Sequence, residues 1–338
     1  TWGASLPLRL GRSALWYARR MEARPYILDF EGTCLDAEET LLWKSTRDFC
    51  EKNVAPVIED AYERGEFPRA LIPMFAEMGY LGASLEGYGC AGMNPVAYGL
   101  INLELERQDS GIRSFCSVQS ALCMYPIYAF GTDEQKERFL PRMARGEVIG
   151  GCGLTEPNAG SDPGSMRTHA KQESADGDYI LRGQKMWITN GPDADVYVIY
   201  AKTDSDAGSK GITAFIVERD APGFSRAPKL DKLGMRGSNT CELVFEDCHV
   251  PASAILGQEG AGVKVLMSGL DYERAVLSGG PVGILQACLD VVLPYVHENK
   301  QFGQAIGEIQ LIQGKLADMY ARWYASGAYL YAGDHDPE

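Results

Sequence analysis

The sequence predicts three successive parts: a helical region, a region of short β-strands, and a second helical region. Before about residue 147, apolar residues recur with the spacing of amphipathic helices. From Val148 this period gives way to short β-branched and aromatic runs, and helical spacing returns at Gly262. We therefore divide the chain into a leader over 1–34, an N-terminal all-α domain over 35–147, a middle β-domain over 148–258 and a C-terminal helical domain over 259–338.

The first helical domain carries recognisable start and stop signals. Asp36 with Glu39 has the spacing of a capping box. Pro56 marks an expected break in the first helix, and Gly79 is a natural end for a second one over 68–78. Further helical patterns cover 96–107 and 118–130, and another helix is expected to start at Thr132.

The β-domain is predicted from four runs punctuated by turn residues. The runs cover 179–181, 196–200, 212–217 and 242–245. Gly, Pro, Asn and Asp separate them. The final helical pattern is interrupted near 302–303, and no internal repeat is present.

Composition limits the class of protein. The 338 residues, 45% hydrophobic and 23% charged, are ordinary for a soluble globular chain of two or three domains. A net charge of −14 argues against a nucleic-acid partner. Nine scattered cysteines without a C-x-x-C pair favour free thiols, and only four histidines argue against a His-rich metal site. No uninterrupted apolar run reaches the roughly 18 residues of a membrane span.

The leader differs from the rest of the chain. The first 25 residues carry five arginines and a single acid, Glu22. An Arg-rich, acid-poor leader is typical of a mitochondrial transit segment, and a disordered basic tail is the alternative.

Two motifs carry the chemistry. The stretch 153–162 reads Gly-Leu-Thr-Glu-Pro-Asn-Ala-Gly-Ser-Asp, a turn of small residues whose free backbone N–H groups suit a phosphate. The stretch 185–190 reads Lys-Met-Trp-Ile-Thr-Asn, and strand alternation places Trp187 and Thr189 on one face. An indole beside a hydroxyl suits a flat heterocycle. Alone, each motif also fits a plain turn or a half-buried strand.

Together the motifs resemble the acyl-CoA dehydrogenase flavoproteins over about residues 35–325. The segments 232–240, 245–248 and 267–274 are similar to isovaleryl-CoA dehydrogenase. The segments 87–90, 109–114, 117–120 and 161–163 are similar to glutaryl-CoA dehydrogenase, so the chain resembles a mosaic of two sister enzymes. Two departures stand out: the C-terminal bundle looks truncated, and Asn299 stands where the family usually has an arginine.

The resemblance implies an acyl-CoA dehydrogenase fold and FAD-dependent α,β-dehydrogenation of an acyl-CoA. It further implies a mitochondrial matrix homotetramer that passes electrons to an electron-transfer flavoprotein, as in leucine catabolism. The family needs a carboxylate base in a dry pocket, and Glu273 stands where the isovaleryl-specific members carry it. The alternative is that Glu273 is an exposed helix acid paired with a neighbouring arginine.

The resemblance also implies the remaining site residues. Those expected to bind FAD are Cys152, Gly153, Leu154, Thr155, Ser161, Trp187, Ile188, Thr189, Phe302 and Gln310. Those expected to bind substrate are Ser161, Ser209, Lys210, Asp271, Tyr272, Arg274, Arg113 and Ser114. Phe302 and Gln310 would serve a neighbouring subunit, although Phe302 also fits a packing role. Asp271 and Arg274 also fit a simple helix ion pair.

Arg113 divides the prediction. In glutaryl-CoA dehydrogenase the matching arginine and serine hold the distal carboxylate of a dicarboxylic acyl group, which suits a guanidinium. An apolar branched acyl chain would not favour an unpaired arginine. The sequence therefore leaves three functions open. They are an isovaleryl-CoA-like dehydrogenase, a glutaryl-CoA dehydrogenase that also decarboxylates, and an inactive truncated paralogue acting as an interaction module.

Overall fold

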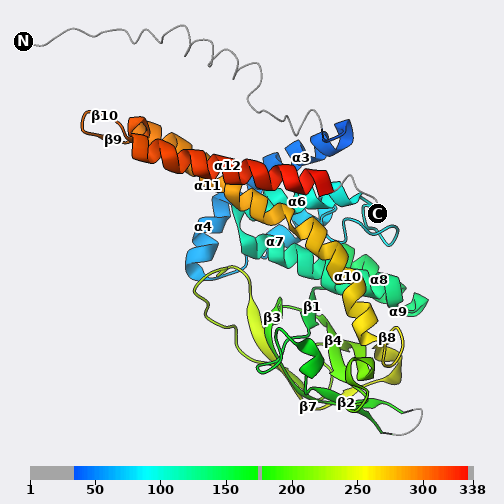
Figure 1. Cartoon of the computed structure of the whole chain (residues 1–338). Coiled ribbons are helices and arrows are strands. Elements are labelled where there is room, and N and C mark those ends of the chain that lie inside the picture. Colours follow the sequence, from blue (N-terminus) through cyan, green and yellow to red (C-terminus); the bar gives the residue numbers. More distant parts are fainter. Residues whose placement is uncertain (1–33, 174–176, 334–338) are drawn as a thin grey trace, which may run out of the picture.

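A computed structural model of the chain describes residues 34–173 and 177–333 (Figure 1). Helices, then a β-sheet, then helices follow one another along the chain, which confirms the predicted three-part architecture. The predicted leader over 1–34 lies, except for Cys34, outside the described residues.

The first helical part contains short helices joined by π-helical turns. Its elements are α3 (Ala37–Phe49), the π-helix η1 (Cys50–Val54), α4 (Ala55–Arg64), α5 (Leu71–Glu77), α6 (Pro95–Gln108), α7 (Ser110–Ser117), the π-helix η2 (Val118–Met124), α8 (Tyr125–Phe130) and α9 (Asp133–Ala144). The Asp36–Glu39 capping box is formed, and a second one joins Thr132 to Gln135. The break predicted at Pro56 is found directly before it: the α-helix gives way to η1 at Cys50, and Pro56 lies in the first turn of α4, a position that tolerates proline.

The middle part is one mixed sheet with strand order β6-β7-β3-β2-β4-β5-β8, and β1 pairs parallel with β4. The strands are β1 (Gly150–Gly153), β2 (His169–Gln172), β3 (Tyr179–Thr189), β4 (Val196–Lys202), β5 (Ile212–Glu218), β6 (Phe224–Arg226), β7 (Thr240–Val250) and β8 (Ile255–Leu256). The four predicted runs are the long strands β3, β4, β5 and β7. The strands of four residues or fewer were not predicted, because a run that short is too brief for alternation of apolar and polar residues to be detected.

Short 3₁₀ turns connect several of these strands. They are η3 (Pro163–Ser165), η4 (Gly208–Gly211) and η5 (Ala252–Ala254). The turns η3 and η4 lie next to each other, and η4 also lies next to the first helix of the last part, α10.

The last part returns to long helices. It contains α10 (Gly262–Leu277), α11 (Gly279–Glu298), the hairpin strands β9 (Lys300–Gln301) and β10 (Gln304–Ala305), the 3₁₀ turn η6 (Ile306–Glu308) and α12 (Gln310–Gly333). In Figure 1, α10 runs from the sheet toward the helices, whereas the β9–β10 hairpin lies at the end of the molecule far from the sheet.

Glycines allow α11 to approach α6 closely. A Cβ added to Gly279 would lie 2.6 Å from the carbonyl oxygen of Gly99, and one on Gly283 would lie 2.1 Å from that of Leu103. A Cβ on Gly280 would lie 1.8 Å from a carboxylate oxygen of Glu106. The α10–α11 segment is therefore fixed against α6 by contacts that no larger residue permits.

Two buried apolar clusters join the first helical part to the sheet. The first contains Phe75 and Ile112 from helices together with Phe215 and Leu243 from strands. The second includes Ile127 from α8 and Val198 from β4. Because each cluster spans both parts, η2 is held firmly over the sheet.

The stretch Gly262–Glu298 is the single helical stretch among the described residues that is long and apolar enough to cross a membrane. It has 37 residues and a mean hydropathy of 1.7 over its most apolar 18-residue window, although the sequence shows no uninterrupted apolar run of that length. About a third of that window is buried. The core helix of a bundle meets the same criterion, and α11 packs closely on α6, so the composition is weak grounds for a span.

Candidate active site

A cavity of about 180 Å³ lies where the sheet, η2 and α10 meet. Six of the predicted cofactor residues line it: Cys152, Leu154, Thr155, Trp187, Ile188 and Thr189. Val118 and Leu122 of η2 and Leu266 and Leu270 of α10 complete the wall. The two motifs, about thirty residues apart in the chain, therefore form one site.

The lining fits one part of a flavin. An indole, two threonine hydroxyls and aliphatic side chains suit a flat heterocycle that stacks and hydrogen-bonds. The cavity is smaller than the roughly 300–1,000 Å³ typical of pockets that enclose drug-sized ligands. A single chain therefore encloses a ring system rather than a whole dinucleotide.

The wall at Trp187 depends on a bulge in β3. The register between β3 and β7 shifts between Lys185 and Ile188, and Trp187 has a left-handed backbone with φ of 64°. This turns Lys185 and Ile188 into the core and leaves the Trp187 side chain 58% exposed. Trp187, Ile188 and Thr189 all line the cavity, so the bulge, and not the simple alternation predicted for Trp187 and Thr189, places these three residues at the site.

Glu273 stands beside this cavity on α10. It follows Leu270 by three residues, so the two side chains lie on the same helix face. The residue is 6% exposed, and its Oε2 atom has no hydrogen-bond partner among the described residues. Burial raises the pKa of Glu273 from 4.5 to about 8, although the charge of Arg113 and a hydrogen bond with Ser117 lower it in part. A dry carboxyl with this pKa suits a general base.

Arg113 is not free. Its Nε donates to Oε2 of Glu106 over 2.7 Å, and its Nη1 donates to Oγ of Ser117 over 2.8 Å. Both Arg113 and Glu106 are mostly buried. Ser114, its predicted partner, is buried, and its carbonyl oxygen accepts a hydrogen bond from the Ser117 hydroxyl. The guanidinium therefore lies next to the Glu273 carboxyl, with its charge balanced by Glu106.

The predicted CoA-binding residues gather beside η3, η4 and α10. Ser161 precedes η3, whereas Ser209 and Lys210 belong to η4, and all three are exposed. None of them lines the cavity. Gly153 does not line it either, since a Cβ there would meet Ile199 of β4 at 2.5 Å and its role is close packing.

The remaining predicted residues either do not line the cavity or have side chains that the structure does not describe. Phe302, 93% exposed, occupies the hairpin between β9 and β10, and Gln310 begins α12 (Figure 1). Arg274 is an exposed residue of the last turn of α10. Asp271 and Tyr272 belong to α10, but their side chains lie outside the part of the chain that the structure describes.

Family models match almost the whole described chain. The acyl-CoA dehydrogenase N-terminal domain matches residues 36–147, the middle domain 151–248 and the C-terminal domain 260–333. The chain belongs to the acyl-CoA dehydrogenase family. It is thus an oxidoreductase acting on CH–CH groups, and FAD is its cofactor.

Its relatives include both kinds of enzyme that the motifs resemble. A mitochondrial 2-methylacyl-CoA dehydrogenase of Solanum tuberosum is 48% identical over 301 residues, 88% of this chain and 73% of that protein. A mitochondrial isovaleryl-CoA dehydrogenase of Bos taurus is 49% identical over 303 residues, 88% of this chain and 70% of that protein. A glutaryl-CoA dehydrogenase from Mycobacterium smegmatis, solved with FADH2, is 40% identical with a TM-score of 0.84, covering 88% and 75% of the two chains.

Sequence reasoning missed several residues at the site of this acyl-CoA dehydrogenase. Glu106 precedes Arg113 by seven residues, but the chain breaks its helix at Asp109, so no simple helical spacing joins them. Lys185 and Glu156 stand inside the two motifs, yet nothing in their spacing shows that they form a buried ion pair. The aliphatic wall that η2 and α10 contribute could not be predicted from the sequence, because only the tertiary fold brings these two helices together.

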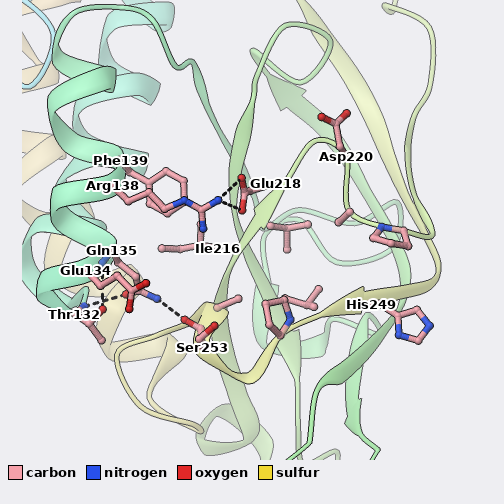
Figure 2. A pocket seen from close by; sticks show the side chains of 16 residues that line it. Thr132, Glu134, Gln135, Arg138, Phe139, Ile216, Glu218, Asp220, His249 and Ser253 are labelled. Atoms are coloured by element: carbon pink, nitrogen blue, oxygen red, sulfur yellow. Dashed lines mark hydrogen bonds and ion pairs between the residues drawn. The ribbon is translucent and has the colours of Figure 1, made fainter.

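A larger cavity of about 550 Å³ lies between α9, the end of β5 and the region after β7 (Figure 2). Arg138 on α9 is paired with Glu218 of β5, and Gln135 donates to the carbonyl oxygen of Ser253. No predicted functional residue lines this cavity. Size alone therefore does not make it the active site of the acyl-CoA dehydrogenase.

Proposed function

We propose that this acyl-CoA dehydrogenase oxidises a short branched-chain acyl-CoA of the isovaleryl-CoA kind to the 2-enoyl-CoA. The proposal rests chiefly on Glu273, a buried carboxyl with an unpartnered oxygen beside the cavity. It also draws on the mitochondrial isovaleryl-CoA dehydrogenases among the relatives.

In this reaction Glu273 takes the α-proton of the thioester at a carboxylate oxygen. Its raised pKa makes the ionised form a stronger base than an exposed glutamate. Leu266, Leu270, Val118 and Leu122 exclude water, which strengthens the electrostatic interactions inside the site. FAD, when bound, supplies the acceptor for the β-hydride.

The Arg113–Glu106 pair makes an apolar acyl chain acceptable. An unpaired guanidinium would penalise a branched alkyl group, but Glu106 neutralises it at 2.7 Å. A distal carboxylate would have to share the guanidinium with Glu106 or displace it. The pair therefore favours a substrate without a second charge.

Glutaryl-CoA oxidation is the second candidate, and a specific contact favours it. Arg113 and Ser117 are hydrogen-bonded to each other next to the proposed base, and guanidinium and hydroxyl donors suit a carboxylate. A guanidinium also keeps N–H groups beyond the three bonded to Glu106 and Ser117.

The assembly and location follow from the same proposal. We place the enzyme in the mitochondrial matrix as a homotetramer that passes electrons to an electron-transfer flavoprotein. Phe302 and Gln310, far from the cavity of their own chain, would contact the FAD of a neighbouring subunit (Figure 1). Ser161, Ser209 and Lys210 would hold the CoA moiety, with the Lys210 ammonium near a phosphate. Asp271, Tyr272 and Arg274 would orient the acyl-CoA on α10.

The test is anaerobic reduction of the FAD-loaded protein, followed by flavin absorbance. Isovaleryl-CoA should bleach the flavin faster than glutaryl-CoA at equal concentration. Faster bleaching by glutaryl-CoA, with release of CO2, would establish the second candidate instead. Protein that takes up FAD but is bleached by neither thioester would contradict both.

The role of Glu273 is tested separately. Glu273→Gln should retain FAD but slow bleaching by about two to four orders of magnitude, the usual loss on removing a general base. Glu298→Gln, an exposed acid on α11, is the matched control and should react like the parent. Bleaching by Glu273→Gln within tenfold of the parent, an effect of about 1.4 kcal/mol or less, would exclude Glu273 as the base.

A further inference from the structure

We infer that the buried Lys185–Glu156 pair is a positioning device that holds Trp187 in its left-handed conformation and so shapes the flavin cavity. The inference rests on FAD occupying that cavity and concerns two residues that do not line it. Three features of the site support it: the contacts of Glu156, those of β3, and the strain at Trp187.

Glu156 joins three segments of chain through one carboxylate. Its Oε2 accepts the backbone N–H of Arg167 over 2.6 Å, and its Oε1 accepts that of Thr168 over 2.9 Å. The same Oε1 accepts the Lys185 ammonium over 2.9 Å. Lys185 is fully buried and Glu156 is 7% exposed, so neither charge is shared with water.

Lys185 and its neighbour tie the bulge of β3 to the turn after β1. The Lys185 ammonium also donates to the carbonyl oxygen of Leu154 over 3.0 Å. The backbone N–H of Met186 donates to the carbonyl oxygen of Thr155 over 2.8 Å. Lys185 and Met186, the two residues of β3 that directly precede Trp187, therefore hold the Leu154–Glu156 segment in place.

The next residue is the strained one. A bulky residue with φ of 64° is strained, and it persists in this conformation only where its surroundings fix it. Without the strain, β3 would continue its alternation and turn the indole away from its present direction. Leu154 and Thr155, on the other side of the contacts, line the same cavity as Trp187. The ion pair therefore sets the relative position of two walls.

Among the described residues, the Lys185 ammonium hydrogen-bonds to one residue of the cavity wall, through the carbonyl oxygen of Leu154. It therefore shapes the cavity through other residues and does not line it. Burial lowers the pKa of Lys185 and the charge of Glu156 raises it in part. Burial raises the pKa of Glu156, but Lys185 and the two backbone donors outweigh it, and the pKa lies below its usual value. The ammonium and the carboxylate thus each favour the charged form of the other, in addition to the hydrogen bond of 2.9 Å between them.

The experiment compares Glu156→Gln/Lys185→Met with Arg182→Met and with the parent. The double variant removes both charges together and leaves no unpaired buried ion, so it is expected to fold. Arg182 lies on the same strand, three residues earlier, in an exposed ion pair with Asp247, and is the matched control. Hydrogen exchange of a peptide covering 183–191 is measured in flavin-free protein, and the dissociation constant for FAD is measured by titration.

In the double variant, the amides around Met186 should exchange about tenfold faster or more, and FAD should bind about tenfold more weakly. Quenching of the flavin fluorescence by Trp187 should also fall, whereas Arg182→Met should match the parent in every measurement. A folded double variant with parental exchange over 183–191 would overturn the inference. Because exchange is measured without flavin, that result does not depend on which acyl-CoA the enzyme oxidises.

Discussion

Replacing Glu273 by glutamine is expected to stabilise the fold at alkaline pH while removing activity. In the folded protein the pKa of Glu273 is about 8, whereas in the unfolded chain it returns to its usual value of 4.5. Between these two values the folded state holds a proton that the unfolded state has lost. The free energy of unfolding therefore falls as the pH rises through this window, and the loss is complete above about pH 8.

The size of the effect follows from the two pKa values. At about 1.4 kcal/mol for each pKa unit, the difference between 4.5 and about 8 amounts to at most about 5 kcal/mol. Glutamine has nearly the same shape and no charge, so it avoids this loss. Local rearrangement around the buried carboxylate reduces the effect, and we expect Glu273→Gln to be more stable than the parent by about 2–5 kcal/mol above pH 8.

The assay is urea denaturation of flavin-free parent and Glu273→Gln at about pH 5 and about pH 8.5. The stability difference should be small at the lower pH and large at the higher one. Glu298→Gln serves as the exposed control and should show no such dependence. An equal difference at both pH values would show that the Glu273 carboxyl is solvated, and the reasoning from burial would be refuted.

Three other predictions concern the same region. The rate of flavin reduction, measured by stopped flow, should rise about tenfold per pH unit below pH 8 and level off above it. A plateau that begins near pH 4.5 would show that the pKa of Glu273 is not raised. Arg113→Ala should weaken a dicarboxylic acyl-CoA more than isovaleryl-CoA and move that plateau to higher pH; unchanged preference in kcat/KM would make Arg113 purely structural. Gly280→Ala should destabilise the protein by about 1–3 kcal/mol, because its methyl group meets Glu106. Gly314→Ala, a helix glycine with open space around it, should instead be neutral or stabilise by about 0.5–1 kcal/mol, and equal melting temperatures would contradict the clash.

Local signals were sufficient for much of the fold. Asp36 and Thr132 mark helix starts because their side chains hydrogen-bond within four residues, a pattern visible in any sequence. The long strands β3 and β5 show through β-branched and aromatic runs. The strands β1 and β8 do not, since glycines in one and two residues in the other leave no alternation to detect.

The site was predicted less completely, for a physical reason. Thr155, Trp187 and Thr189 stand in short motifs, so these residues could be named before their contacts were known. The partners of Arg113 and Lys185 could not, because ion pairs form between segments that the fold brings together. Burial of Glu273 likewise depends on helix packing, so the sequence could favour Glu273 as the base by resemblance but could not exclude an exposed helix acid.

The glycines of α11 show how residues without functional groups can govern a reaction. Gly279, Gly280 and Gly283 bring the backbone of α11 against α6. Glu273 lies less than two helical turns before the first of them, on the helix that continues directly into α11. Any side chain at these three positions would push α11 away from α6 and, with it, move the carboxyl that we propose as the base, while leaving every proposed reacting group intact. A substitution at any of these glycines is therefore expected to change the position of Glu273 relative to the cavity as well as the packing of α11 on α6.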